Sequence, residues 1–127
     1  MARRENFDIP GTGHAAPIPL GCKVGNVFYS SAIGGRNTET EETSTDPADQ
    51  AHWMFRSMKT LIEAAGGSTD DIVHVSLLLK DRALREHIDK EWLAMFPDEH
   101  SRPARHAHQV DLGGANLMQC EIVAVIG

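Results

Sequence analysis

The sequence predicts an α+β fold in which two helices pack on one face of a four- to six-stranded mixed sheet. Two segments carry apolar residues at helical spacing, and the remaining ordered segments are short and apolar like strands. Their order along the chain is β-β-α-β-α-β-β, and such elements pack as two layers around one core. The 127 residues are enough for one domain, which we expect to cover residues 1–127.

The first helix is expected to begin at Asp46 and to end at the glycine pair Gly66 and Gly67. Aspartate is a favourable N-cap, and Pro47 suits the first helical position. Glycine commonly ends a helix because it adopts the left-handed conformation. The apolar residues of its buried stripe are Ala51, Met54, Phe55, Met58, Leu61, Ile62 and Ala65.

The second helix is expected from about Asp81 to Phe96, where Pro97 stops it. Helical spacing again defines an apolar stripe, which predicts that one side of this helix faces the core. The residues of that stripe are Leu84, Ile88, Trp92, Met95 and Phe96.

The expected strands include the segments 24–31, 72–79, 105–112 and 117–126. Gly25-Asn26 indicates a turn before the first strand or a bulge within it. The last two strands flank Gly-Gly-Ala-Asn at 113–116, so we expect them to form a hairpin. Residues 10–19 and 36–46 are expected to be irregular, because the first stretch is rich in Gly and Pro and the second has no apolar residue.

The strand at 72–79 reads Ile-Val-His-Val-Ser-Leu-Leu-Leu, a composition typical of a strand covered on both faces. Two helices cover only one face of the sheet. We therefore expect the other face to be buried against another subunit.

Composition disfavours several classes of protein. The formal net charge of −6 at pH 7 argues against general nucleic-acid binding. No apolar run approaches the ~20 residues of a membrane span, and the first residues, MARRENFDIPG, lack the apolar core of a signal peptide. Cys22 and Cys120 lie far apart in the sequence, and we expect reduced thiols and a cytoplasmic location.

The densest group of chemically useful residues is near the C-terminus. Arg105 and Ala107 should point to one face of their strand, and Gln119 and Glu121 should share a face of the partner strand. An arginine beside a carboxylic acid can hold a substrate carboxylate while the acid moves protons. The alternative is a structural cross-strand pair between Arg105 and Glu121.

Two other patterns are less specific. His106-x-His108 has a spacing found in metal sites on strands, but no third ligand is evident and no HExxH or CxxC motif occurs, so we expect no metal. Ser31 ends a strand before the small residues Ala32 and Gly34. It is interpreted as a hydrogen-bonding group for a ligand or as part of a plain turn, rather than as a nucleophile.

Five segments together resemble the Rid (YjgF/YER057c/UK114) family. They occur in the family's order and spacing over residues 16–126, and the Pro-Ala-Arg at 103–105 is the most specific of them. The segments are GNVFYSS at 25–31, LIEAAGG at 61–67, DIVHV at 71–75, LKD at 79–81 and PAR at 103–105.

The resemblance implies a chorismate-mutase-like fold and a homotrimer with pockets at the subunit interfaces. Deaminases of this family hydrolyse enamines and imines such as 2-aminoacrylate and 2-iminopropanoate to 2-keto acids and ammonia, without a metal or organic cofactor. The implied partner is thus a small carboxylate-bearing substrate. The alternative is a non-catalytic member that binds small carboxylates or has a regulatory role. An endoribonuclease activity, sometimes ascribed to the family, fits poorly with an acidic chain.

The resemblance also implies roles for single residues. Arg105 would hold the substrate carboxylate, and Ser31 would line the pocket. The chain departs from the family at Ala32, where glycine is usual, at Ile18, where tyrosine is usual, and at Asp89, where the deaminases have asparagine. A negative charge at Asp89 disfavours a carboxylate ligand unless Asp89 is paired or protonated.

Ala107 stands where the family usually has cysteine. This replacement matters less for the pocket if the position contributes only its backbone N–H. The acid of the last strand is either Glu121 or the position held by Gln119, depending on whether the preceding hairpin is one residue longer or shorter than usual. Both residues share a face, so alternation does not decide between them. We favour Glu121, because Gln119 could hold a water but could not act as a base.

Overall fold

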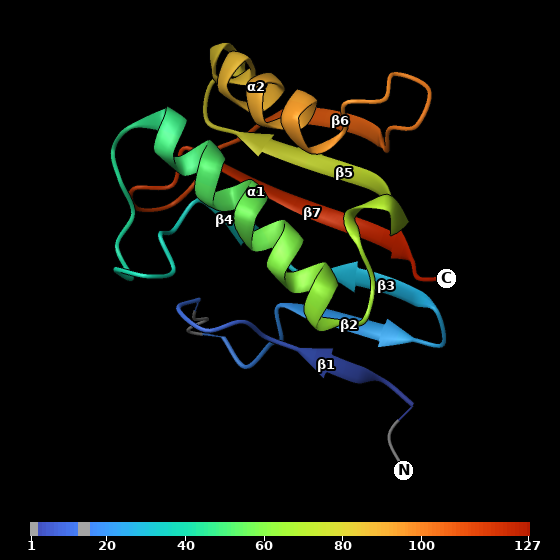
Figure 1. Cartoon of the computed structure of the whole chain (residues 1–127). Helices are drawn as coiled ribbons and strands as arrows, with labels where there is room; N and C mark the ends of the chain where they lie inside the picture. The colour runs from blue at the N-terminus through green and yellow to red at the C-terminus, as the bar shows by residue number, and fades with distance from the viewer. Residues whose placement is uncertain (1–2, 13–15) are drawn as a thin grey trace.

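The computed structural model describes residues 3–12 and 16–127 and confirms the α+β fold. Part of the expected irregular segment 10–19 lies outside the described residues. Figure 1 shows both helices on the same side of the sheet. The elements are β1 (Glu5–Phe7), β2 (Gly21–Val24), β3 (Val27–Ser30), β4 (Ile33–Gly34), α1 (Pro47–Ala64), β5 (Ile72–Leu79), α2 (Arg85–Met95), β6 (Ala104–Gln109) and β7 (Met118–Val125).

The strand order is β1-β2-β3-β7-β5-β6, with β4 also paired to β7. β5 and β6 are parallel, whereas β5 and β7 are antiparallel. The predicted hairpin between the last two strands is therefore wrong, because β5 lies between β6 and β7. A strand as apolar as β5 is stable in the centre of a sheet, where both edges have hydrogen-bond partners. Residues 110–117 carry the chain past β5 instead of forming a tight turn.

The first helix begins where its sequence predicts, whereas α2 begins at Arg85, later than the predicted start at Asp81. The side chain of Asp46 accepts a hydrogen bond from the Ala48 N–H, and Pro47 is the first residue of α1. Asp81 caps a short 3₁₀ turn at Arg82–Leu84, and α2 follows it. The pair Gly25-Asn26 is the turn between β2 and β3, with Gly25 at a φ of 61°, so the strand predicted over 24–31 is the second arm of a hairpin. The described residues form seven strands, more than the four to six expected, because the short β1 and β4 join the sheet.

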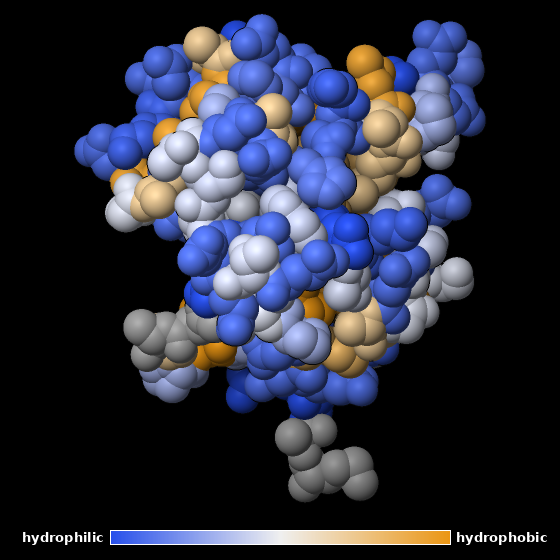
Figure 2. Space-filling model, turned by 60° about the vertical axis from the view of Figure 1, so that its left-hand side comes forward, coloured by the Kyte–Doolittle hydropathy of each residue, from blue (hydrophilic) through white to orange (hydrophobic). Residues whose placement is uncertain are grey.

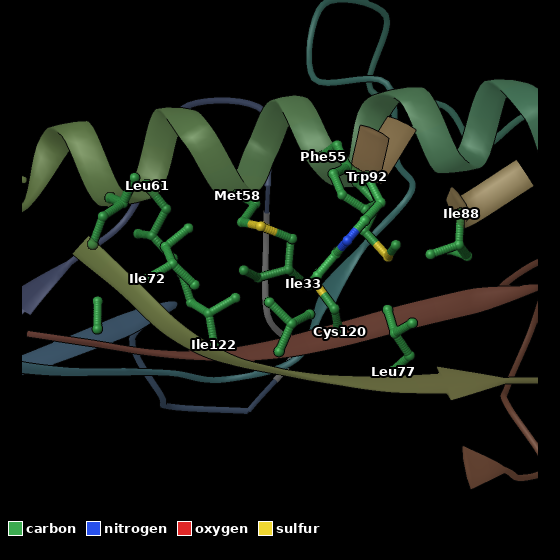
Figure 3. Packing of buried hydrophobic residues seen from close by; sticks show 14 of the residues in the cluster. Ile33, Phe55, Met58, Leu61, Ile72, Leu77, Ile88, Trp92, Cys120 and Ile122 are labelled. Carbon is green, nitrogen blue, oxygen red and sulfur yellow. The ribbon is translucent and has the colours of Figure 1, made fainter. Parts of the chain in front are cut away.

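The core lies between the helices and one face of the sheet. Figure 3 shows Met58 and Leu61 of α1 pointing toward Leu77, Cys120 and Ile122 on β5 and β7. All five of these side chains are buried. Burying one such side chain stabilises the fold by about 1.5–3 kcal/mol, so this layer holds α1 on the sheet.

The opposite face of the sheet carries exposed apolar side chains. Val27 and Val125 are paired across β3 and β7, and Tyr29 lies on the same face. These three side chains are 41–59% exposed, so the single chain leaves an apolar sheet face uncovered. On the face of the molecule in Figure 2, by contrast, hydrophilic residues predominate. None of the helices in the described residues is both long and apolar enough to span a membrane.

Gln50 connects the start of α1 to two loops. Its side chain is fully buried, and its amide nitrogen donates to the carbonyl oxygens of Ser44 at 2.7 Å and Ala115 at 2.9 Å. Its side-chain oxygen accepts from the Leu117 N–H at 2.9 Å. Gly35 packs directly on the Gln50 backbone, where a Cβ on residue 35 would lie 2.5 Å from the Gln50 carbonyl oxygen. One buried amide thus fixes the segment that leads into β7.

We expect the substitution Gln50→Leu to lower the free energy of unfolding by about 2–3 kcal/mol, because three backbone groups lose their partner. Urea denaturation of the variant and of the wild type measures the difference. Gln109→Leu is the matched control, since Gln109 is exposed and its side chain accepts a single hydrogen bond, of 3.3 Å, from the described part of the chain. A change at Gln50 no larger than that of the control would contradict this account.

Candidate active site

Arg105 lies on β6, the edge strand next to β5. It is aligned with Val75, whose side chain is buried against the helices, so Arg105 points to the helix side of the sheet. Its Nη2 lies 2.7 Å from Oδ1 of Asp89 on α2. Ala107 shares the face of Arg105 and packs against the core. The structure therefore brings together three of the predicted site residues, Arg105, Asp89 and Ala107.

Trp92 completes this group. The Arg105 guanidinium carbon lies 4.9 Å from the centre of the Trp92 ring, which itself packs edge-on against Phe96. Trp92 is only 8% exposed, which confirms the prediction that it is a core residue. The sequence analysis did not predict that its ring also supports the Arg105 guanidinium. Asp89 and Trp92 are three residues apart, a spacing that places both on one side of a helix. This spacing is the sequence feature from which a shared contact with Arg105 could have been predicted.

The ion pair is partly open to solvent. The Arg105 side chain is 24% exposed and that of Asp89 is 52% exposed. Pairs of this kind contribute only about 0–1 kcal/mol to stability, so the pair is not needed to hold α2 in place. Asp89 is paired, which is one of the two conditions under which a carboxylate ligand is tolerated beside it.

A second group lies at a cavity of about 240 Å³ near β4 and the start of β7. Ala32 and Gln119 line this cavity. Its other polar lining residues are Thr12, Arg36, Thr43 and Asn116. Ser31 directly precedes Ala32 in the chain but is not among the described residues that line the cavity, and its hydroxyl donates a hydrogen bond to the Pro19 carbonyl at 2.8 Å. Ile18, the residue before Pro19, is 48% exposed.

Arg36 is the charged residue among the described residues that line the cavity, and sequence analysis missed it. Its Nη2 lies 3.9 Å from Oε1 of Glu41, whereas its Nε is buried and has no hydrogen-bond partner among residues 3–12 and 16–127. Arg36 occurs in the polar loop that the sequence correctly identifies as irregular. Nothing in its spacing marks it, because a loop has no periodicity from which direction can be inferred.

The two candidate acid positions on β7 differ in their surroundings. Gln119 is aligned with Gly34 of β4 and lines the cavity. Glu121 is aligned with Ser76 of β5, is exposed, and is not among the described residues that line the cavity. The residue beside Ala32 is therefore the amide and not the carboxylate.

Arg105 and Glu121 lie on opposite faces of the sheet within one chain. Arg105 is aligned with Val75 and Glu121 with Ser76, and successive residues of a strand point to opposite sides. The possible cross-strand pair between Arg105 and Glu121 is therefore wrong, because β5 separates the two strands and the faces differ. The Arg105 group and the cavity group do not meet in a single chain.

His106 and His108 point away from the helix side, as expected from alternation. Their ring centres are 4.0 Å apart. Among the residues that the structure describes, no group of three or more His, Cys, Asp or Glu side chains is arranged to hold a metal ion.

Cys120 lies in the core beneath α1. Burial, with a smaller contribution from the charge of Glu121, raises the pKa of the Cys120 thiol far above its ordinary range. A thiol held in this form is a poor nucleophile, so Cys120 is a packing residue.

Comparison with known proteins gives a consistent picture. Residues 16–126 match the model of the family described as Endoribonuclease L-PSP. A 2-iminobutanoate/2-iminopropanoate deaminase of the mite Dermatophagoides farinae is 36% identical over 72 residues, which cover 52% of this chain and 56% of that protein. The chain thus spans little more than half of the length of that relative.

Two bacterial relatives match over a larger share. The 3-aminoacrylate deaminase RutC of Acinetobacter baylyi is 31% identical over 76% of both chains. The 2-iminobutanoate/2-iminopropanoate deaminase of Escherichia coli K12 is 30% identical over 74% of both chains.

Solved structures show the same fold. RidA from an Antarctic Psychrobacter matches with a TM-score of 0.84 and 28% identity, covering 99% of this chain and 100% of that one. The YjgF gene product of Escherichia coli matches with a TM-score of 0.84 and 26% identity, covering 95% and 98%.

We expect the two thiols to differ in reactivity. In the native protein Cys22, which is partly exposed, should react with a thiol reagent at least about ten times faster than Cys120. Reaction is followed by absorbance at pH 8 before and after denaturation. The Cys22→Ser variant should show no fast phase until it unfolds, and a fast phase in that variant would contradict the burial of Cys120.

Proposed function

Because the chain belongs to the Rid (YjgF/YER057c/UK114) family, we propose that it is a hydrolytic deaminase of small enamine or imine carboxylic acids. The products are a 2-keto acid and ammonia. Relatives at 30–36% identity that are named as imine or 3-aminoacrylate deaminases support this reading. The observation that carries the proposal is Arg105, a guanidinium held in one orientation at an accessible edge of the sheet.

Arg105 binds the substrate carboxylate. A guanidinium presents five N–H donors in a planar fork, and the contact with Asp89 uses its Nη2. The remaining donors are suited to a second carboxylate, and stacking on Trp92 keeps the fork in a fixed plane. Preorganisation of this kind reduces the entropy lost when the substrate binds.

A complete site requires a second copy of the chain. Arg105 and the cavity lined by Ala32 and Gln119 are separate in one chain, and the exposed apolar sheet face gives a surface on which copies can associate. In the proposed homotrimer the Arg105 group of one subunit faces the cavity group of its neighbour. Ser31 and Ile18 shape the entrance to that cavity, and Ala107 lines the Arg105 side.

Gln119 is the residue of β7 that faces the substrate in this proposal. Its place beside Ala32 favours it over Glu121, which our sequence analysis preferred. Its amide can position a water molecule through its oxygen or its nitrogen, although it cannot take a proton from that water. No metal or organic cofactor is required, since hydrolysis of an imine needs only water and proton transfer.

The alternative function is binding of a small carboxylate without turnover. An amide at position 119 and an arginine already paired with Asp89 favour it. Such a protein would bind 2-keto acids through Arg105 and release no ammonia. Measurement of both binding and turnover therefore separates the two functions.

We expect the wild type to accelerate ammonia release from 2-iminopropanoate, generated in place by an amino-acid oxidase. Arg105→Ala should lower kcat/KM by roughly 10²-fold, because charged hydrogen bonds to the substrate are lost. Arg56→Ala is the matched control: Arg56 also stacks on a tryptophan, with its guanidinium carbon 5.1 Å from the Trp53 ring, and also pairs with a carboxylate.

The control should keep wild-type activity. No acceleration by the wild type would rule out the deaminase with this substrate. Equal losses in the Arg105 and Arg56 variants would show that the effect is not specific to the proposed site.

We also expect complementation between subunits. Arg105→Ala removes one half of the shared site, and Ala32→Phe fills the cavity of the other half. When the two variants are co-expressed in equal amounts, about one third of the sites in mixed trimers combine two intact halves and regain activity. Ammonia release by purified mixed trimers measures this. Absence of any recovery in trimers shown to be mixed would place the whole site in one subunit.

A further inference from the structure

Asp89 is the acidic side chain that lies closest to the proposed substrate carboxylate. Among residues 3–12 and 16–127, it is the acidic side chain within 4.0 Å of the Arg105 guanidinium, with Oδ1 lying 2.7 Å from Nη2. Ile88 and Trp92 of the same helix, labelled in Figure 3, point into the core. Asp89 itself is 52% exposed, so water and substrate reach its carboxylate.

This position suits the chemistry of a 2-imino acid. The imine carbon is bonded directly to the carboxylate carbon. When Arg105 holds that carboxylate, the C=N group lies beside the guanidinium, where Asp89 is already in contact. A negative charge next to a protonated imine stabilises the iminium ion, which is the form that water attacks.

We infer that Asp89 is the general acid and base of the hydrolysis, a role that rests on the deaminase function proposed above. Glu121 cannot serve the Arg105 of its own chain, since it lies on the opposite face of the sheet. Gln119 has no ionisable group. Asp89 therefore supplies the carboxylate that the cavity lacks.

The steps balance without a further reactant. Water forms the new C–O bond at the iminium carbon as its proton passes to the Asp89 carboxylate, which leaves a neutral carbinolamine. The protonated Asp89 then gives that proton to the amine nitrogen. The C–N bond breaks with its electron pair on nitrogen, and the hydroxyl proton returns to Asp89 as the C=O bond forms. Ammonia leaves, takes up this proton, and the carboxylate is restored.

The same contact has an opposite effect on binding. Asp89 partly neutralises Arg105 and so weakens its attraction for a carboxylate. Removal of the charge at Asp89 should therefore strengthen the binding of a product such as pyruvate while it slows the reaction. A residue that merely positioned Arg105 would lose both when substituted.

The test is Asp89→Asn, which keeps the shape of the side chain and removes its charge. We expect kcat with 2-iminopropanoate to fall roughly 10²-fold or more, whereas pyruvate, measured by calorimetry, should bind roughly two- to fivefold more tightly. Asp89→Glu should recover part of the activity. Glu91→Gln is the matched control on the same helix, because Glu91 also pairs with a side chain, His52 at 3.2 Å, and should change kcat by less than about twofold.

Four other results would overturn the inference, and each points to a different explanation. If Asp89→Asn keeps or gains kcat, Asp89 only competes for Arg105. If it loses both kcat and pyruvate affinity, Asp89 acts by positioning Arg105. If Glu121→Gln loses kcat and Asp89→Asn does not, the acid comes from β7. If the wild type itself gives no acceleration, the deaminase function fails, and the inference fails with it.

Discussion

The pairing of β5 on both of its edges determines the rest of the molecule. One face of β5 and its neighbours carries the core under α1, and the alternation of the strand then sends Arg105 toward the helices and Glu121 away from them. The same alternation leaves an apolar face uncovered. The separation of Arg105 from the cavity in one chain is thus a direct result of sheet geometry and not of side-chain conformation.

The parts of the fold that depend on local sequence were predictable. The cap at Asp46, the proline at 47 and the Gly25-Asn26 turn each act within a few residues, and the structure contains all three. The hairpin prediction was wrong because the partner of a strand depends on contacts far along the chain. A short loop and two apolar segments do not reveal that a third strand lies between them.

The candidate site was likewise predictable only in part: its residues on strands and helices could be predicted, and its loop residue could not. The directions of Arg105 and Ala107 followed from alternation, and the spacing of Asp89 and Trp92 on α2 contained the contact that holds Arg105. Arg36 carried no such signal, since its direction depends on how an irregular loop folds back on α1. Gln119 and Glu121 point to the same face, so their different surroundings become apparent only from the location of the cavity.

Gln50 has a consequence for how this protein can change over evolution. Its buried amide holds the backbone at 115–117 and so shapes the cavity, although it is not one of the side chains that line the cavity among the described residues. The main support of this backbone is therefore not one of those lining side chains. A position such as Ala32 is free to vary without loss of the cavity's frame, which allows substrate preference to drift while the scaffold stays constant.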